Sequence, residues 1–259
     1  MRSRTRARIA GSGSKVGFLP DWDGLAISTQ GLTGVIAHDV DDQVVEVWAG
    51  TPVAELQIAL IEHGQCLPLT NDLSLAAQIS GVHGTIGGLI AMNLPHALSS
   101  QCGGPRDWTL GMTVVRTDGT LAKCGSKAVK NVAGYDAHRL LVGSRGTLGA
   151  IAKVFLRTYP VRALPTHQLS VVGSIEAPTF VARTLRTDFA ATVESTPRLI
   201  ASDPASCTLW SVERPNLPAE SWMVGPEGER FRPEQPAKFE RRAREIFDPE
   251  GKLAHGWQK

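Results

Sequence analysis

The sequence predicts a mixed protein of the α+β class, and three observations carry that prediction. An apolar strand pattern is followed by a helical pattern between residues 44 and 64. A β-hairpin pattern covers residues 111–124. From Pro160 onward, prolines become frequent and glycines rare, which predicts a domain boundary. A chain of 259 residues with 42% hydrophobic residues is long enough to bury a substantial core.

The N-terminal segment is expected to lead into a first strand. Met1 to Arg8 is basic without an amphipathic helical face, so we interpret it as a solvated arm rather than a transit peptide. Ile9 opens the apolar strand, and residues 11–15 (GSGSK) follow as a loop whose N–H groups, hydroxyls and ammonium suit a phosphate. For this loop alone, a flexible Gly/Ser turn is the alternative.

The first strand–helix unit has clear boundaries. The strand is predicted around Val44 to Val47 and ends at Gly50. Thr51 is predicted as the helix N-cap and Pro52 as the first helical residue. The apolar stripe of the helix, which ends at Gly64, consists of Val53, Leu56, Ala59 and Leu60.

The central region continues with short elements separated by glycines. A glycine turn at residues 84–88 leads into a short helix of small residues that Pro95 interrupts. The hairpin turns at Asp118-Gly119. A brief helix is predicted for Ala137 to Leu141, and a strand from Leu148 to Leu156 follows it.

After Pro160 the patterning is weaker, and we predict a smaller α+β unit. The expected strands are Leu169 to Val172, Arg198 to Ala201 and Cys207 to Val212, with a helix at Thr179 to Phe189, a proline-rich loop at Pro215 to Pro236 and a charged helix at Phe239 to Phe247.

Composition excludes several classes of function. The net charge of +2 comes from dispersed Lys and Arg residues, which argues against nucleic-acid binding. No apolar run reaches the roughly 18 to 20 residues that a membrane helix needs, so the chain is expected not to be transmembrane. The four cysteines form no CxxC pair, and we interpret them as reduced thiols of a cytoplasmic protein, with no metal site.

Three glycine-rich segments lie in the centre of the chain and suggest a flavin site. They are His83 to Gly88 (HGTIGG), Asn131 to Asp136 (NVAGYD) and Gly143 to Gly149 (GSRGTLG). Glycines beside Ser and Thr let backbone N–H groups approach a bulky anion, because no Cβ obstructs them. A pyrophosphate is the natural candidate.

The order of these motifs resembles the FAD-binding domain of the PCMH type, also called the vanillyl-alcohol-oxidase type. Within that superfamily, the stretch from Lys130 to Ser144 and the closing Phe247 to Leu253 (FDPEGKL) are similar to the FAD-binding E subunit of bacterial glycolate oxidase. The resemblance implies two small α/β subdomains in residues 1–159, a reduced α+β cap in residues 160–236, and a C-terminal helix, residues 237–259, that returns to the FAD domain.

Carried over position by position, the resemblance also implies a set of cofactor-binding residues. Those around the pyrophosphate are Gly11, Ser12, Gly13, Ser14, Lys15, Thr85, Gly87 and Gly88. Those at the flavin or adenine end are Gly143, Gly149 and Ile151. The first loop lacks the His or Cys to which some relatives attach FAD, so non-covalent FAD is expected.

The chain departs from the family pattern in three ways, one of which is a cap region, about residues 160–235, that is short for a substrate domain. Relatives carry a leading βα segment, whereas only Met1 to Ala10 precede the first loop here, so either the start is misplaced or the FAD domain is pared down. Ser12 replaces a common glycine, and Ala10 replaces a common arginine, which removes one positive charge.

Catalytic residues are not evident from the sequence. Oxidation of a 2-hydroxy acid needs a proton acceptor and a cation for the carboxylate. His138 and Arg139 are the candidates for these roles, with a packing or surface pair as the alternative. No His-x-His or His/Glu cluster suits a metal.

The resemblance implies a function within a complex. The chain would be the FAD-binding subunit of a glycolate oxidase, working with a second flavin subunit and an iron–sulfur subunit in the cytoplasm or peripherally at the inner membrane. Two alternatives stay open: a non-catalytic assembly subunit with weak or no FAD binding, and a stand-alone FAD oxidoreductase with another small substrate.

Overall fold

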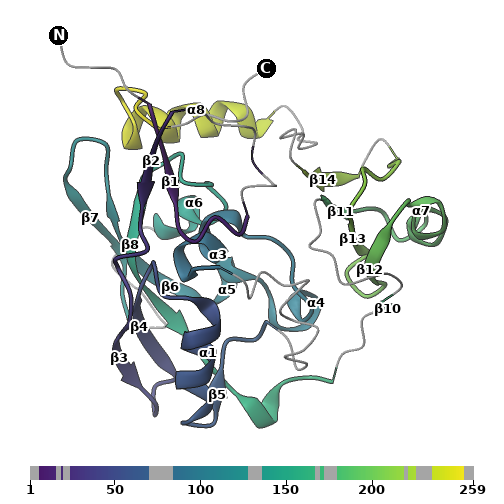
Figure 1. The fold of residues 1–259 in the computed structure, drawn as a ribbon, viewed down its shortest axis with the longest axis horizontal. Helices are drawn as coiled ribbons and strands as arrows, with labels where there is room; N and C mark the ends of the chain where they lie inside the picture. The colour runs from purple at the N-terminus through teal and green to yellow at the C-terminus, as the bar shows by residue number, and fades with distance from the viewer. Residues whose placement is uncertain are drawn as a thin grey trace.

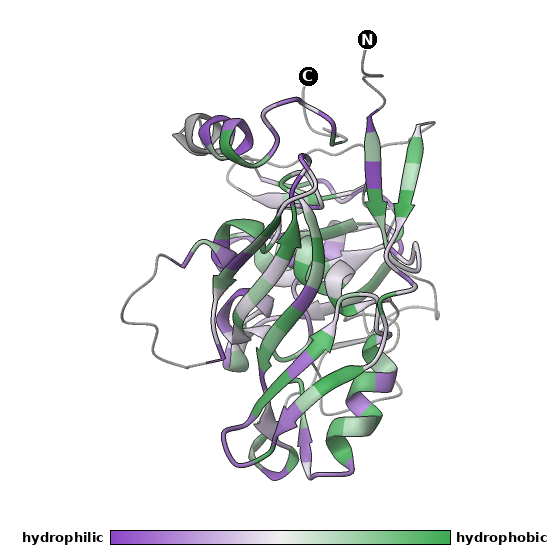
Figure 2. Cartoon of the chain, turned by 90° about the vertical axis from the view of Figure 1, so that its left-hand side faces the viewer, coloured by the Kyte–Doolittle hydropathy of each residue, from purple (hydrophilic) through white to green (hydrophobic). Residues whose placement is uncertain are grey.

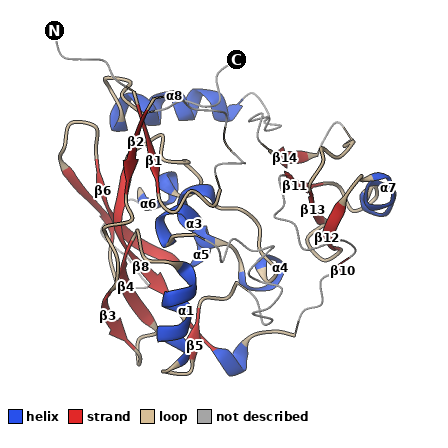
Figure 3. Cartoon of the chain, viewed as in Figure 1, coloured by secondary structure: helices blue, strands red, loops and turns tan. Residues whose placement is uncertain are grey.

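The computed structural model describes residues 6–15, 19, 24–69, 84–127, 136–166, 170–171, 180–218, 221–225 and 235–253, without the side chains of 170–171 and 235–240. Figures 1 and 3 show short helices and several sheets, and the predicted α+β class is confirmed. Among the described residues, no helix has the length and apolar character needed to cross a membrane.

The largest layer is a five-stranded antiparallel sheet in the order β3-β4-β8-β6-β7. Its strands are β3 (Val35–Asp39), β4 (Val44–Trp48), β6 (Thr109–Val115), β7 (Leu121–Gly125) and β8 (Ala150–Arg157). Figure 2 shows hydrophobic residues along much of these strands. The predicted strand at Val44, the hairpin and the strand ending at Leu156 are therefore confirmed.

Short helices cover one face of this sheet (Figure 1). They are α1 (Val53–Ile61), α3 (Ile86–Met92), α5 (Pro105–Trp108) and α6 (His138–Leu141), and the short helix α4 (Ser99–Cys102) lies farther from the sheet. Val45, Val154 and Leu156 of the sheet share a buried core with Leu56 of α1 and Ile90 of α3. Strand β6 is buried along most of its length, as expected for a strand inside this core.

A parallel two-stranded ribbon lies beside this body and consists of β1 (Ala7–Ala10) and β2 (Leu25–Ser28). Near the C-terminus, Leu253 forms a parallel bridge with Ala7 on β1. A further small pair joins β5 (Gln65–Cys66) to β9 (Tyr159–Pro160), which is followed by the 3-10 turn η2 (Val161–Ala163).

A second five-stranded antiparallel sheet has the order β10-β12-β13-β11-β14. Its elements are β10 (Ser170–Val171), β11 (Phe180–Arg183), β12 (Leu199–Asp203), β13 (Thr208–Ser211) and β14 (Trp222–Val224), with α7 (Phe189–Ser195) beside them. Val181 and Trp210 form a buried cluster with Met92 of α3, so this sheet packs against the end of that helix. The last helix is α8 (Gln235–Phe247).

Two predictions in the second sheet are wrong. The helix expected at Thr179 to Phe189 is instead strand β11, and α7 starts only at Phe189. Strand β11 is hydrogen-bonded to β13 on one side and β14 on the other, and this pairing outweighs the weak helical pattern. The expected loop at Pro215 to Pro236 contains β14 and the start of α8.

The predicted N-cap of α1 is also wrong. Pro52 occupies the N-cap position, and no side chain caps the helix. The Thr51 hydroxyl instead accepts a hydrogen bond from the Gly34 N–H at 2.9 Å, which ties α1 to the segment before β3. A tertiary partner therefore takes the oxygen that a helix cap would have used.

Gly50 marks a close approach between the N-terminal ribbon and the main sheet, and its replacement gives a first prediction. A Cβ at residue 50 would lie 1.9 Å from the carbonyl oxygen of Thr29 and 2.7 Å from that of Leu32. Gly50→Ala should therefore lower the free energy of unfolding by about 1–3 kcal/mol, the usual cost of overpacking. Urea denaturation followed by tryptophan fluorescence measures this.

Gly31→Ala is the matched control, because a Cβ at residue 31 meets nothing within 4 Å. We expect this variant to unfold within about 0.5 kcal/mol of the wild type. Equal unfolding midpoints for the two alanine variants would contradict the assigned packing.

Candidate cofactor site

A cavity opens where the end of β1, the loop of residues 11–15, α3 and residues 145–151 meet. Its volume of about 80 Å³ gives room for several water-sized groups. All but one of the predicted cofactor residues line it, namely Gly11, Ser12, Gly13, Ser14, Lys15, Thr85, Gly87, Gly88, Gly149 and Ile151. The structure thus brings together segments that lie more than 130 residues apart in the chain.

The start of the loop, residues 11–13, provides backbone hydrogen-bond donors that no described residue uses. The N–H groups of Gly11, Ser12 and Gly13 make no hydrogen bond to any described residue. Gly13 has a φ of +78°, which a side chain would disfavour. Successive free N–H groups in such a turn are a typical anion-binding arrangement.

Lys15 brings a largely buried positive charge to the same wall. Its side chain is only 8% exposed, and its Nζ lies 3.4 Å from the Ser14 hydroxyl. Burial lowers the Lys15 pKa from 10.5 to about 8. The nearby Gly84 makes room for this side chain, since a Cβ there would lie 2.6 Å from Nζ.

The charged residues of the cavity wall are all cationic. Arg8, Lys15 and Arg145 line the cavity, and no carboxylate does so within the described part of the chain. This imbalance favours an anionic ligand. Arg8 lies two residues before Ala10 and therefore on the same side of strand β1, and both residues line the cavity.

Helix α3 lines the cavity with its glycines, but the N–H groups of its first turn are not available to a ligand. Thr85 is its N-cap and accepts a hydrogen bond from the Gly88 N–H at 3.3 Å. The Ile86 and Gly87 N–H groups donate to the carbonyls of Thr51 and Ala49, at 2.9 and 2.7 Å. The first-turn N–H groups are thus used inside the protein, and the glycines allow the helix to approach strand β4 closely.

The segment from Gly143 to Ile151 closes the far side. Gly143 itself does not line the cavity, and its N–H donates to the Ile90 carbonyl at 3.0 Å. The Arg145 N–H donates to the Ala91 carbonyl at 2.8 Å, so two hydrogen bonds hold this loop against α3. A Cβ at Gly149 would lie 2.6 Å from a methyl group of Val114, which requires glycine there.

The two catalytic candidates lie outside the cavity wall. His138 is buried behind the hairpin, where a Cβ on Gly125 would lie 2.9 Å from its Nδ1, and burial is the main cause of its lowered pKa. Arg139 pairs at the surface with Asp136, Nε to Oδ2, at 3.1 Å. The motif from Asn131 to Tyr135 and the residues His83 and His167 lie outside the described residues.

Sequence reasoning missed several lining residues. Arg8 was assigned to the solvated arm, although a strand places residues 8 and 10 on one side. Met92 was missed too, although it follows Gly88 by one helical turn. All four cysteines are free thiols, and the described residues contain no His, Cys, Asp or Glu group arranged to hold a metal.

Comparison with known families identifies the N-terminal half of the chain. Residues 2–125 match the family model described as FAD binding domain. This segment is similar to FAD binding domains. The match confirms both the predicted resemblance and FAD as the expected cofactor, and the donor set of the cavity fits the negatively charged pyrophosphate of FAD.

Curated relatives of this FAD binding domain are similar to the chain over about three fifths of its length. A D-lactate dehydrogenase from Archaeoglobus fulgidus is 33% identical over 59% of this chain and 32% of its own. The glycolate oxidase subunit GlcE of Escherichia coli is 31% identical over 61% and 43%. A mitochondrial D-lactate dehydrogenase [cytochrome] from Arabidopsis thaliana is 35% identical over 60% and 25%. The chain therefore spans less than half the length of these relatives.

The contact between Gly11 and Thr85 gives a prediction about cofactor affinity. A Cβ at residue 11 would lie 2.2 Å from the Thr85 hydroxyl oxygen and 2.9 Å from its methyl group. Gly11→Ala should displace the loop. Because overpacking typically costs about 1–3 kcal/mol, FAD binding should weaken roughly 5- to 100-fold. Quenching of flavin fluorescence during titration measures the affinity.

A double-mutant cycle separates this contact from general damage. In the Thr85→Ala background the obstructing atoms are gone, so Gly11→Ala should cost much less affinity there. An equal loss in both backgrounds would mean that the loop does not pack on Thr85.

Proposed function

We propose that this chain is the FAD-binding subunit of a glycolate oxidase complex and takes part in oxidising glycolate, or a related small 2-hydroxy acid, to the 2-oxo acid. The cationic cavity on the FAD binding domain is the observation that carries this proposal. The relatives support the substrate class, because their names refer to glycolate and D-lactate, both small 2-hydroxy acids.

The residues of the cavity have distinct roles in this proposal. The N–H groups of residues 11–13 and the Lys15 ammonium bind the pyrophosphate, while Ile9, Met92 and Ile151 give the wall its apolar surface. Held by these residues, FAD would supply the redox chemistry as the hydride acceptor for the substrate carbon. The cofactor is held without a covalent bond.

The proposed partners are a second flavin subunit and an iron–sulfur subunit. One of the relatives, GlcE, is named a glycolate oxidase subunit, which favours work in a complex. An iron–sulfur cluster would lie on another chain, because the cysteines here lack the required spacing. We place the complex in the cytoplasm or peripherally at the inner membrane.

We further propose that the chain is divided into an FAD domain (residues 1–159), a reduced cap (residues 160–236) and a C-terminal helix (residues 237–259).

One observation favours a non-catalytic assembly subunit as the second candidate. No described residue that lines the cavity is a carboxylate or histidine able to accept the substrate's hydroxyl proton. His138 and Arg139, the candidates for base and clamp, are absent from the cavity wall. On this second reading the chain binds FAD weakly or not at all and shapes the complex.

The absorption spectrum of the purified chain tests the two functions. A flavin band that bleaches when glycolate or D-lactate is added without oxygen supports an enzymatic subunit. A flavin band that does not bleach, with bleaching only after the partner subunits are added, supports an electron-relay or assembly role. A protein that binds no added FAD overturns the proposal.

Lys15 gives a prediction about pH. Without FAD, Lys15 loses its proton near pH 8, because burial lowers its pKa, whereas a bound pyrophosphate would stabilise the charged form. FAD affinity should therefore fall as pH rises through about 8, and FAD should bind with proton uptake above that pH. Titrations at several pH values between 6.5 and 9.5 measure this.

Lys15→Met should weaken FAD binding at pH 7 and remove this dependence on pH. In the absence of FAD the same variant should be more stable at pH 7, because burial disfavours the charged Lys15 ammonium of the wild type. Lys127→Met is the matched control, since this lysine is exposed and pairs at the surface with Asp39. A pH dependence that persists in Lys15→Met would rule out this lysine as its source.

A further inference from the structure

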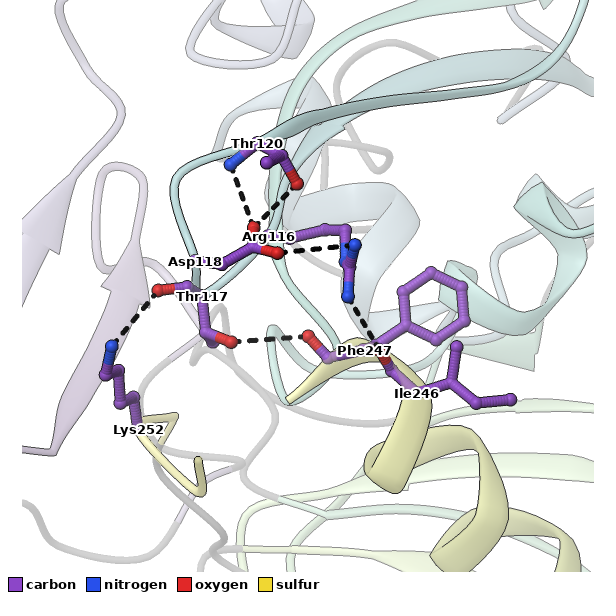
Figure 4. Close-up of polar contacts among 7 residues, drawn as sticks. All are labelled: Arg116, Thr117, Asp118, Thr120, Ile246, Phe247 and Lys252. Carbon is purple, nitrogen blue, oxygen red and sulfur yellow. Dashed lines mark hydrogen bonds and ion pairs between the residues drawn. The ribbon is translucent and has the colours of Figure 1, made fainter. Parts of the chain in front are cut away.

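The segment after α8 connects two parts of the protein that are far apart in the sequence. On one side, the end of α8 meets the turn between β6 and β7 (Figure 4). Arg116 Nη2 donates to the Ile246 carbonyl at 3.0 Å, and the Thr117 hydroxyl donates to the Phe247 carbonyl at 3.5 Å. These side chains satisfy carbonyls that a helix C-terminus leaves without partners.

On the other side, the same segment pairs with β1. The Ala7 N–H donates to the Lys252 carbonyl at 2.8 Å, and Leu253 forms a parallel bridge with Ala7. Both Ala7 and Leu253 are buried. Strand β1 is therefore held between β2 and a short piece of C-terminal chain, and it continues directly into the cofactor loop at Gly11.

Asp248 holds the turn that makes this pairing possible. Its side chain is 5% exposed, Oδ1 accepts the Lys252 N–H at 2.9 Å and Oδ2 accepts the Leu253 N–H at 3.0 Å. The Gly251 N–H donates to the Asp248 carbonyl at 3.1 Å, and Gly251 has a φ of +64°. The buried Asp248 carboxylate thus fixes the backbone of residues 251–253 in the position where residues 252 and 253 pair with Ala7.

We infer that Asp248 is a positioning residue for the cofactor loop: by orienting residues 252–253 against β1, it fixes Arg8, Ile9 and the loop of residues 11–15. Asp248 does not itself line the cavity. It acts by keeping β1 ordered before the cofactor arrives, so that binding does not have to order the strand and the loop. This inference rests on the proposed role of the cavity as the FAD site.

The coupling must work in both directions. If residues 252–253 favour the ordered loop, then FAD bound to the loop must favour the pairing of residues 252–253 with β1. In the wild-type protein, FAD should therefore slow amide hydrogen exchange at Lys252 and Leu253, although neither residue lines the cavity. No change there on FAD binding would overturn the inference.

Asp248→Ala tests the residue directly, with Glu250→Ala as its matched control. Glu250 is exposed in the same turn, and its side chain pairs with Lys252 Nζ at 2.8 Å. In Asp248→Ala, exchange at residues 7–10 and the FAD dissociation constant should each rise about tenfold, since two charge-assisted hydrogen bonds are lost. Glu250→Ala should match the wild type in both.

Local readouts distinguish positioning from general instability. Exchange in β8 (Ala150–Arg157) should be the same in Asp248→Ala and the wild type, whereas a purely structural role would accelerate both strands. If Asp248→Ala does not fold, Gly251→Val serves instead, because it disfavours the positive φ without a clash: a Cβ there meets nothing within 4 Å.

The outcomes also separate this inference from the proposed function. If the wild type binds FAD and Asp248→Ala binds it equally well, the positioning role is wrong and the FAD site stands. If the wild type binds no FAD, the proposed function fails, and the exchange of residues 7–10 in the free protein still decides whether Asp248 orders β1. Unchanged exchange at those residues in both Asp248→Ala and Gly251→Val overturns the inference.

Discussion

The cofactor site depends on how closely the loop of residues 11–15 approaches the start of α3. Two positions without side chains allow it: Gly11 lies against Thr85, and Gly84 lies against Ser14 and Lys15. An extra methyl group at either position would occupy space already filled by the neighbouring residues. The cavity, the burial of Lys15 and its lowered pKa all follow from this approach, because it removes the ammonium from water.

Most secondary-structure elements of the segment that matches the FAD binding domain could be predicted from the sequence. Glycines, proline and alternating apolar residues predicted the strand at Val44, the hairpin turning at Asp118 and the short helix before Pro95, and the structure has all three. These elements are determined locally, by backbone conformations that few residues adopt. The resemblance of the motifs also located nearly all of the residues that now line one cavity.

The errors occur where a distant partner decides the structure. Strand β11 was predicted as a helix, because its pairing with β13 and β14 leaves no signal in a short sequence window. Thr51 was predicted as a cap, but Gly34 uses its hydroxyl oxygen. The same holds for the N–H groups at the start of α3. They donate to the carbonyls of Ala49 and Thr51, which lie more than thirty residues earlier, so a short sequence window could not show that these donors are used.

Met92 links the two halves of the protein. It lines the cavity, and it also belongs to the buried cluster formed by Val181, Trp210 and Val224 of the second sheet. One side chain therefore forms part of both the cofactor wall and the core of the other unit. A replacement of the second sheet by a homologous one would consequently need a matching residue at position 92, because substitutions in contact with each other are not independent.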